Sequence, residues 1–348
     1  MSGWRRSVRR HGVGKTLAFF VVAQVIAAAL AIVAVEATVG AYREYQIRHT
    51  PIAYQRIFRP PSDAITERPF RIATIGDSHT WGKDAPLGQG YPDHLGRLIA
   101  ADHPDFRFEI ENIARAGRNS SQMLAKWRFL LNTMPGAFDL AIVCVGANNH
   151  HNLDFAGGFV AERVDKLPPE KKLAYLLQNS GTYQLSKAAR GRLTQLLDED
   201  RAQWSGCVFC EEDEPFLRQW LRYDLEQTIQ ASWENYVDVV LLGYAIDKPW
   251  VHRTMREVAA EKHILFVDTY ALGLELDGTF DENHPFIGPT YHPTAEGYFR
   301  VAKNLYDHLL DAKLLPFDEP HLSAKGRAFK VKNPATATHN AVVAEEPG

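Results

Sequence analysis

Apolar positions form one long run near the N-terminus and a series of short runs after residue 69. The short runs alternate with segments in which apolar residues recur every three or four positions. Short continuous runs are typical of strands buried on both faces, whereas the three-to-four spacing is typical of amphipathic helices. The alternation predicts an α/β fold in which helices cover both faces of a parallel sheet.

The pattern predicts five strands, which are Phe70–Ile75, Phe106–Ile110, Asp139–Val145, Val237–Leu242 and Ile264–Val267. It predicts helices over Tyr91–Ala101, Ser120–Leu131, Pro215–Tyr236, Trp250–Lys262 and Thr294–Leu310. Residues 150–214 interrupt the alternation and form an insertion after the third strand, with short helices over Leu173–Leu177 and Tyr183–Leu197. The insertion either overhangs the carboxyl edge of the sheet as a lid or packs away from it as a scaffold extension.

The long apolar run, Leu17–Val35, contains only one polar residue, Gln24. As a helix it spans about 28 Å, which is enough to cross a bilayer core. The apolar region of a cleaved signal peptide is usually shorter, so we expect an uncleaved transmembrane signal anchor over residues 16–39. Val35-Glu36-Ala37 is nevertheless compatible with a cleavage site.

The basic N-terminus, residues 1–15, predicts that this end stays in the cytoplasm and that everything after about Val39 lies outside, in the periplasm of a Gram-negative cell. Residues 40–68 contain several prolines and are expected to form a juxtamembrane linker. The catalytic domain is expected over 69–315. Residues 316–348 lack periodicity and are expected to be a disordered tail.

The net charge of −3 and the lack of a basic stripe beyond the N-terminus argue against a nucleic-acid partner. Cys144 lies within an apolar strand and is expected to be a buried thiol. Cys207 and Cys210 form a single CxxC without a second ligand pair, which disfavours a zinc site. They are expected to form a local disulfide if the domain is exported.

The first strand runs into Gly76-Asp77-Ser78-His79. Gly76 allows a sharp turn without a Cβ clash, and the turn places Ser78 at the carboxyl edge of the sheet, where open α/β sheets bind ligands. A serine there can attack a carbonyl if a base accepts its proton and donors stabilise the oxyanion. The competing interpretation is an ordinary turn in which the serine caps a helix.

Three further blocks follow in order: Asn112–Asn119 after the second strand, Val143–Asn149 at the end of the third, and His292–Tyr298 at the start of the last helix. Together with Gly76-Asp77-Ser78 they resemble the SGNH/GDSL hydrolase family over about Pro69 to Leu315. The resemblance implies a flavodoxin-like, doubly wound, five-stranded parallel sheet and a serine hydrolase without a cofactor.

In this arrangement Ser78 is the nucleophile and His292 the general base. The oxyanion donors are the backbone N–H groups of Ser78 and Gly117 and the side-chain amide of Asn148. His79, His150 and His151 also invite a metal interpretation, but no carboxylate or cysteine is spaced with them, so no metal is expected.

The acid of the triad departs from the family pattern. The family places an aspartate three residues before the histidine, and here that position is Pro289. Asp281 either reaches back to orient His292 or forms a working pair with His284. A third possibility is a Ser–His dyad oriented by a backbone carbonyl. We take Asp281 as the expected acid.

We therefore expect a membrane-anchored serine esterase or acyl hydrolase, acting through an acyl-enzyme on Ser78. The family resemblance favours O-acyl esters of envelope polysaccharide as substrates. One alternative is a catalytically inactive glycan- or lipid-binding module, because the usual aspartate is missing. The other is a lysophospholipase, thioesterase or O-acyl transferase. The oligomeric state is left open.

Overall fold

The computed structural model describes residues 4–49, 55–58, 68–153, 158–183, 185–186, 209, 213–272 and 285–317. The chain divides into two compact units. One comprises Met1–His49 and Leu173–Ser205. The other comprises Thr50–Lys172 and Gly206–Gly348 and contains the sheet.

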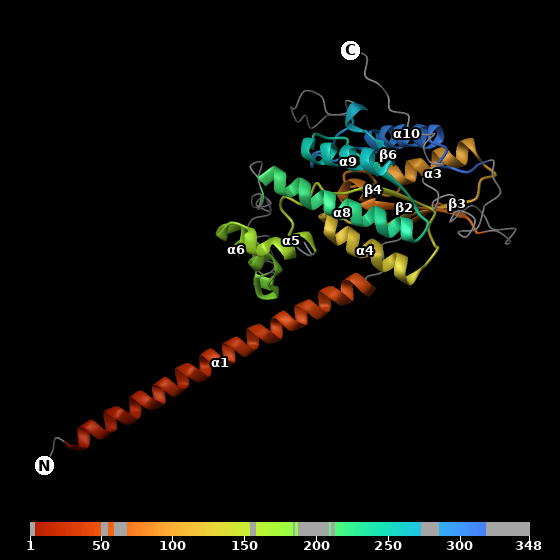
Figure 1. Ribbon diagram of the computed structural model, residues 1–348. Coiled ribbons are helices and arrows are strands. Elements are labelled where there is room, and N and C mark those ends of the chain that lie inside the picture. The colour runs from red at the N-terminus through yellow and green to blue at the C-terminus, as the bar shows by residue number, and fades with distance from the viewer. Residues whose placement is uncertain are drawn as a thin grey trace. The chain divides into compact units, whose positions relative to one another are not determined.

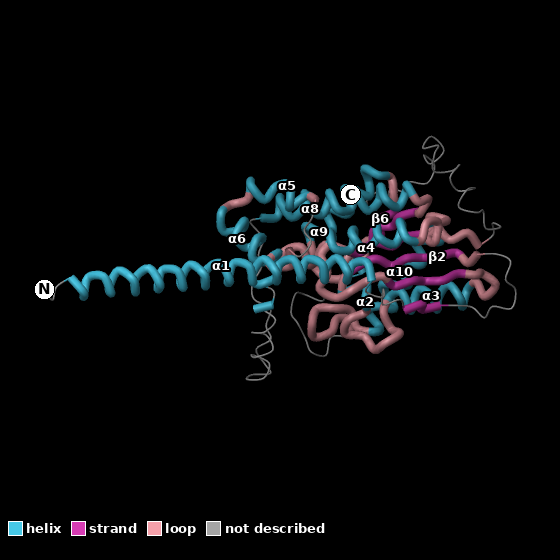
Figure 2. The backbone as a smooth tube through the Cα atoms, turned by 90° about the horizontal axis from the view of Figure 1, so that it is seen from below, coloured by secondary structure: helices cyan, strands magenta, loops and turns pink. Residues whose placement is uncertain are grey.

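Six strands form one sheet in the order β1-β3-β2-β4-β5-β6. Figures 1 and 2 show this sheet among the helices that pack on it. The parallel strands are β2 (Phe70–Gly76), β3 (Phe108–Asn112), β4 (Leu140–Cys144), β5 (Asp238–Leu242) and β6 (Leu265–Val267). In chain order the parallel strands lie second, first, third, fourth, fifth, which is the flavodoxin-like order. The predicted five-stranded parallel sheet is confirmed.

An additional strand, β1 (Gln55–Phe58), pairs antiparallel with β3 at the edge of the sheet. Gln55 lies opposite Asn112 and Phe58 opposite Ile110, with a register shift between Arg56 and Phe58. The segment lies within the linker that the sequence predicts over residues 40–68. Its four residues are too few for the pattern to reveal a strand, and prolines lie on both sides.

Helices alternate with the strands. They are α3 (Tyr91–Asp102), α4 (Ser120–Thr133), α8 (Glu214–Glu234), α9 (Pro249–Lys262) and α10 (Ala295–Asp311). α3 packs against α10, while α4 packs against α8 and α8 against α9. The chain moves from β2 to β3 in one direction across the sheet and then back past β2 to β4 in the other. Because crossovers between parallel strands are right-handed, this reversal puts α3 and α4 on opposite faces of the sheet. Both faces of the sheet are thus covered.

Local sequence signals explain where these helices begin. The Asn119 side chain accepts from the Gln122 N–H, and the Gln122 side chain accepts in return from the Asn119 N–H, forming a capping box at the start of α4. Thr294 caps α10 by accepting from the Gly297 N–H at 3.2 Å. These caps fix the loops that precede both helices, and the site lies on those loops.

The core includes large aromatic residues whose polar atoms are bonded. The Trp127 indole N–H donates to the Ser232 hydroxyl at 2.8 Å, and the Trp220 indole N–H donates to the Ser121 hydroxyl at 2.8 Å. Both indoles are completely buried. They bind α4 to α8, because each bond joins one helix to the other.

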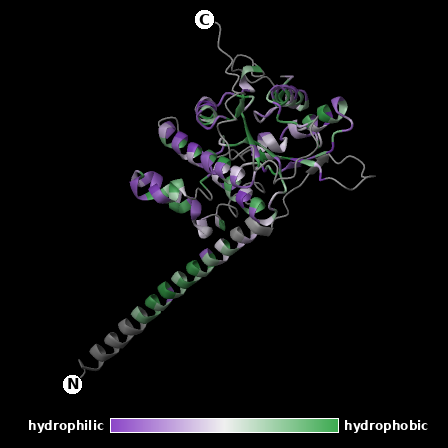
Figure 3. Cartoon of the chain, turned by 45° about the vertical axis from the view of Figure 1, so that its right-hand side comes forward, coloured by the Kyte–Doolittle hydropathy of each residue, from purple (hydrophilic) through white to green (hydrophobic). Residues whose placement is uncertain are grey.

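The N-terminal helix α1 (Trp4–His49) contains one candidate membrane span, Ala18–Tyr42, with a mean hydropathy of 2.7 over its most apolar window. Figure 3 shows the apolar residues along this helix. No part of that window is buried within the structure. Length and composition therefore allow this helix to cross a bilayer.

The insertion begins with α5 (Phe159–Arg163), a 3₁₀ turn (Val164–Lys166) and α6 (Pro169–Asn179). Residues 181–183 and 185–186 are helical as well. The rest of the predicted helix Tyr183–Leu197 lies outside the described residues, as do Cys207, Cys210 and nearly all of the tail. The disulfide and the disordered tail therefore stay predictions.

Candidate active site

The turn after β2 requires glycine. A Cβ on Gly76 would lie 2.0 Å from the Thr80 hydroxyl and 2.7 Å from the Cys144 carbonyl oxygen. Only a residue without a Cβ lets the short helix α2 (Ser78–Trp81) follow β2 so closely. Asp77 caps this helix by accepting from the His79 N–H at 3.0 Å. Ser78 therefore opens a helix at the carboxyl end of the central strand β2.

Ser78 and His292 lie in contact although 214 residues separate them. The His292 Nε2 is 2.6 Å from the Ser78 Oγ, and both residues are largely buried. The loop that carries His292 is fixed by a 2.7 Å bond from the Gly288 N–H to the His292 carbonyl oxygen. The two residues that the sequence predicted as nucleophile and base are thus brought together in hydrogen-bonding geometry.

The other ring nitrogen of His292 faces Thr290. Its Nδ1 lies 2.9 Å from the Thr290 hydroxyl and 3.9 Å from the Asp84 carboxylate. The same Asp84 oxygen accepts from the Thr290 hydroxyl at 2.7 Å and from the Thr290 N–H at 2.9 Å. Asp84, Thr290 and His292 therefore form a continuous hydrogen-bonded chain.

The order of donors along this chain determines the histidine tautomer. A carboxylate only accepts, so the single hydroxyl proton of Thr290 goes to Asp84. The Thr290 oxygen then accepts from His292 Nδ1–H. In a neutral imidazole this leaves Nε2 without a proton and directed at the Ser78 hydroxyl. That is the tautomer a general base needs.

Asp84 was not predicted from the sequence. It lies in the loop after α2 with a φ of 68°, a left-handed conformation that aspartate tolerates better than most residues. A Cβ on Gly288 would lie 2.9 Å from the Asp84 Cβ, so glycine allows the two loops to approach closely. No spacing rule links the two loops. The expected acid, Asp281, lies outside the described residues, as does His284.

Burial determines the charge state of His292. Desolvation and, to a smaller extent, the positive charge of Lys83 lower the pKa of His292, the Asp84 carboxylate opposes both, and the net result is a pKa of about 4. The imidazole is consequently neutral at pH 7 and able to accept a proton. The electrostatics of the loop are thus compatible with the role of general base.

His79 packs beside the same imidazole. Its ring centroid lies 4.4 Å from that of His292 at an interplanar angle of 30°, and the ring of Tyr244 meets it edge-on at 4.9 Å. Burial lowers the pKa of His79 well below its usual value, so the ring is neutral. His150 and His151 contact each other instead. Within the described ranges no group of three or more His, Cys, Asp or Glu residues is placed to hold a metal ion.

The side chain of Asn148 reaches the turn that carries Ser78. Its amide donates to the Asp77 carboxylate at 3.3 Å and to the Arg118 carbonyl oxygen at 3.0 Å. Asp77 is fully buried, also accepts from the Tyr244 hydroxyl at 2.7 Å, and has its pKa raised to about 6 by desolvation. Asn148 therefore adjoins the nucleophile turn, with its amide shared between two acceptors.

Gly117 lies beside the same loop with a φ of 74°, which favours glycine. Its carbonyl oxygen accepts from the Asn152 side chain at 2.5 Å. Asn149 accepts from the Ser120 N–H at 2.9 Å and donates to the Ser120 hydroxyl at 2.8 Å. These bonds fasten the loop after β4 to the loop before α4, so Gly117 and Asn148 come close to one another.

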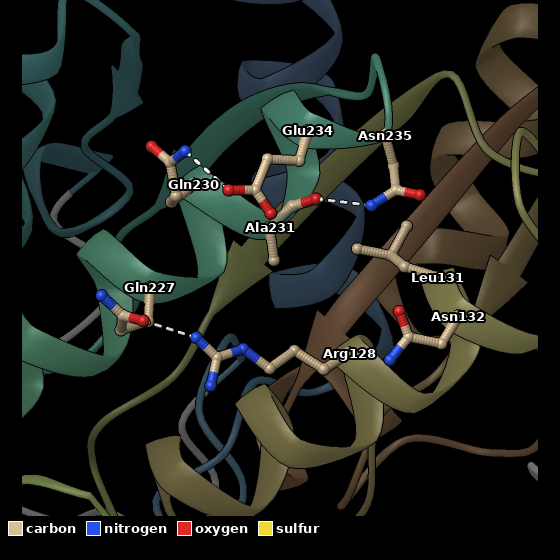
Figure 4. Close-up of a pocket in the computed structure, with 8 residues that line it drawn as sticks. All are labelled: Arg128, Leu131, Asn132, Gln227, Gln230, Ala231, Glu234 and Asn235. Carbon is tan, nitrogen blue, oxygen red and sulfur yellow. Dashed lines mark hydrogen bonds between the residues drawn. The ribbon is translucent and has the colours of Figure 1, made fainter.

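A separate hollow of about 310 Å³ lies between α4 and α8 (Figure 4). Its lining residues are Arg128, Leu131, Asn132, Gln227, Gln230, Ala231, Glu234 and Asn235. The Arg128 guanidinium donates to the Gln227 side chain at 2.5 Å across it. It lies in the helical layer and contains neither Ser78 nor His292, so we assign no chemistry to it.

The GDSL-like lipase/acylhydrolase family matches residues 74–300, which is more than half of the chain and includes Ser78, Gly117, Asn148 and His292. The chain belongs to this family. It is therefore a hydrolase-family protein of the SGNH/GDSL class, as the four sequence blocks indicated.

Solved structures with similar folds include TesA, with 16% identity, a TM-score of 0.42, and coverage of 70% of this chain and 99% of TesA. The acetylxylan esterase Axe2 from Geobacillus stearothermophilus shows 15% identity and a TM-score of 0.43, with coverage of 72% of this chain and 96% of Axe2. The esterase EstA from Pseudoalteromonas sp. shows 11% identity and a TM-score of 0.41, with coverage of 69% of this chain and 96% of EstA. No curated protein matches the chain.

Proposed function

We propose that this protein is a serine esterase or acyl hydrolase that acts through an acyl-enzyme on Ser78. The observation that carries the proposal is the 2.6 Å contact between Ser78 Oγ and His292 Nε2, combined with the engagement of His292 Nδ1 by Thr290. A serine hydroxyl becomes a useful nucleophile only when a correctly oriented base accepts its proton. The geometry supports that requirement.

In the proposed reaction, His292 Nε2 accepts the Ser78 proton as Oγ attacks the ester carbonyl carbon. The tetrahedral oxyanion is stabilised by the N–H groups of Ser78 and Gly117 and by the Asn148 amide, which exchanges its long 3.3 Å bond to Asp77 for one to the oxyanion. The intermediate collapses, the C–O bond to the alcohol breaks, and His292 returns the proton to the leaving oxygen. Water then attacks the acyl-enzyme by the same route and releases the carboxylic acid.

Asp84 takes the orienting role in this proposal, in place of Asp281. It acts through Thr290, because its carboxylate accepts from both hydrogen-bond donors of that residue, the hydroxyl and the backbone N–H. Thr290 in turn fixes the Nδ1 proton of His292. Asp84 is thus a positioning residue that does not touch the reacting atoms, and the family's usual aspartate position can be occupied by Pro289.

We further propose that the protein is anchored through Ala18–Tyr42, with its N-terminus in the cytoplasm and the catalytic unit outside. An extracytoplasmic site has no access to cytosolic thioesters, which favours O-acyl esters of envelope polysaccharide. The assignment is supported by the basic N-terminus and the apolar span. Lysolipid hydrolysis and acyl transfer are the competing activities.

The experiment is hydrolysis of p-nitrophenyl acetate by the full chain in detergent, compared with Ser78→Ala. We expect the variant to lose nearly all activity, and equal rates would overturn the proposal. An acetylated glycan and a lysolipid, tested in parallel, discriminate between substrate classes. Activity confined to the lysolipid would overturn the assignment of polysaccharide as the substrate, but not the proposal that the protein is an esterase.

A further inference from the structure

The insertion exposes apolar side chains along one face of α6. Leu173 is 56% exposed, Leu176 52% and Leu177 39%. The three occupy positions i, i+3 and i+4, so they share a face of the helix. Leu185, in the helical stretch that follows, is 53% exposed. A helix of a soluble domain would turn such a face inward.

The segment after α6 is bonded to the candidate membrane span. The Glu36 carboxylate, on α1, accepts from the Ser180 hydroxyl at 2.7 Å, from the Gly181 N–H at 2.6 Å and from the Thr182 N–H at 3.0 Å. A carboxylate on a predominantly apolar span is costly unless its hydrogen bonds are satisfied. The insertion supplies those bonds.

The two segments also pack closely. A Cβ on Gly181 would lie 2.6 Å from the Val39 Cβ, so only glycine fits there. Val39 lies three residues after Glu36, on the same side of α1. Small residues allow this close approach between helices in membranes. The neighbouring Gly40 has nothing within 4 Å of where its Cβ would lie, and it therefore provides a matched control.

We propose that residues 173–183 and 185–186 lie in the lipid interface of the bilayer, attached to the anchor by Glu36 and Gly181. Glu36 directly follows the apolar run Leu17–Val35 and lies in the last third of the candidate span Ala18–Tyr42, so the residues bonded to it lie near the end of the membrane-spanning stretch. The exposed leucines then enter the acyl boundary, as in amphipathic helices that lie on membranes. This inference rests on the proposed membrane anchoring.

The test uses the full chain with its three native cysteines replaced and a single cysteine introduced as Leu176→Cys, Ile26→Cys or Asn132→Cys. Each variant carries an environment-sensitive fluorophore and is reconstituted into phosphatidylcholine–phosphatidylglycerol vesicles containing spin-labelled lipid. We expect strong quenching at position 26 within the span, clear quenching at 176, and none at 132, an exposed position on α4.

Quenching at position 26 without quenching at 176 would overturn this inference and leave the anchor intact. A fluorophore at 176 that is shielded from water but not quenched would also overturn it, because protein, such as a second copy of the chain, would then cover the face. Loss of quenching at 26 would remove the anchor and this inference together.

The close packing of Gly181 against Val39 is tested by adding Gly181→Leu to the Leu176→Cys protein. The leucine cannot fit against Val39, so we expect lipid quenching at position 176 to fall. Gly40→Leu adds the same side chain to open space and should leave quenching unchanged. Equal quenching in both variants would overturn the role of Gly181.

Discussion

The Asp84 carboxylate binds both the hydroxyl and the backbone N–H of Thr290, across 206 residues of sequence. Thr290 lies two residues before His292 and contacts its Nδ1. Asp84 thereby acts on the imidazole through an intermediate hydroxyl. The missing aspartate at position 289 is therefore compatible with an oriented histidine.

The first prediction concerns this relay. Asp84→Asn can donate from its amide to Thr290, which frees the hydroxyl proton to point at His292 and disfavours the productive tautomer. We expect kcat to fall by about 10- to 100-fold, by analogy with the loss on removing the hydrogen-bond partners that orient metal-binding histidines. The acid limb of the pH profile should also move to lower pH, because the Asp84 charge raises the pKa of His292.

Asp281→Asn is the matched control, since Asp281 is the acid expected from the sequence. A larger loss of kcat in this variant than in Asp84→Asn would contradict the relay. Thr290→Val removes the hydroxyl with little change in volume and should resemble Asp84→Asn. The double variant should be little worse than either single one, because the two residues act as a unit.

The second prediction is the pH dependence of kcat/KM. His292 must be neutral to accept a proton, and burial lowers its pKa to about 4, so activity should persist through pH 5 and fall as the pH approaches 4. Lys83→Met removes a positive charge and should move this limb to higher pH, whereas the distant Lys303→Met should not. Circular dichroism over the same range excludes acid unfolding.

A limb near pH 6 would contradict that assignment. It would instead indicate titration of Asp77, whose burial raises its pKa to about 6 and whose carboxylate accepts from the Asn148 amide. Protonation of Asp77 neutralises the carboxylate that accepts the hydrogen bond from the Asn148 amide. The two pKa values are far enough apart for the profile to distinguish the groups.

The third prediction concerns the oxyanion. Asn148→Ala removes one donor, and we expect kcat to fall by about 10²- to 10³-fold with a much smaller change in KM. Thermal unfolding must be measured in parallel, because the Asn148 amide also bonds to Asp77 and to the Arg118 carbonyl oxygen. A folded variant with wild-type kcat would remove Asn148 from the oxyanion site.

The fourth prediction concerns the turn that presents Ser78. Gly76→Ala places a methyl group 2.0 Å from the Thr80 hydroxyl, so Thr80 or the backbone has to move. We expect the free energy of unfolding to fall by about 3 kcal/mol or more, at the upper end of overpacking effects. In Gly136→Ala the added methyl group has nothing within 4 Å. The free energy of unfolding should fall by only about 1 kcal/mol, because alanine disfavours the left-handed φ of 68°. Similar losses in both variants would contradict the steric account.

The sheet could be predicted because its strands are nearly continuous apolar runs. The start of β2 at Phe70 agrees with the prediction. β3 begins two residues later than predicted and continues past Ile110 to Asn112, so it includes the buried polar residue Glu111, at which the apolar pattern had stopped. Glu109 is paired with Arg71 at 2.9 Å, a long-range contact that no local pattern reveals.

The candidate site likewise contains residues that local sequence motifs indicate and residues that only tertiary structure brings together. Ser78 and His292 could be predicted because each lies in a local block with turn or cap signals. Asp84 could not, because its place beside Thr290 depends on the close approach of two distant loops at Gly288. The packing of the His79 ring against that of His292 likewise follows from tertiary structure alone.

The central claim is that His292 activates Ser78 as a nucleophile. The most direct measurement is covalent labelling of the full chain by a fluorophosphonate, followed by mass spectrometry of the modified peptide. We predict stoichiometric modification of Ser78 in the wild type, slower labelling in Asp84→Asn, and none in a folded His292→Ala variant. An unmodified Ser78 in the folded wild-type protein would contradict the account and favour a binding module that has kept only the fold.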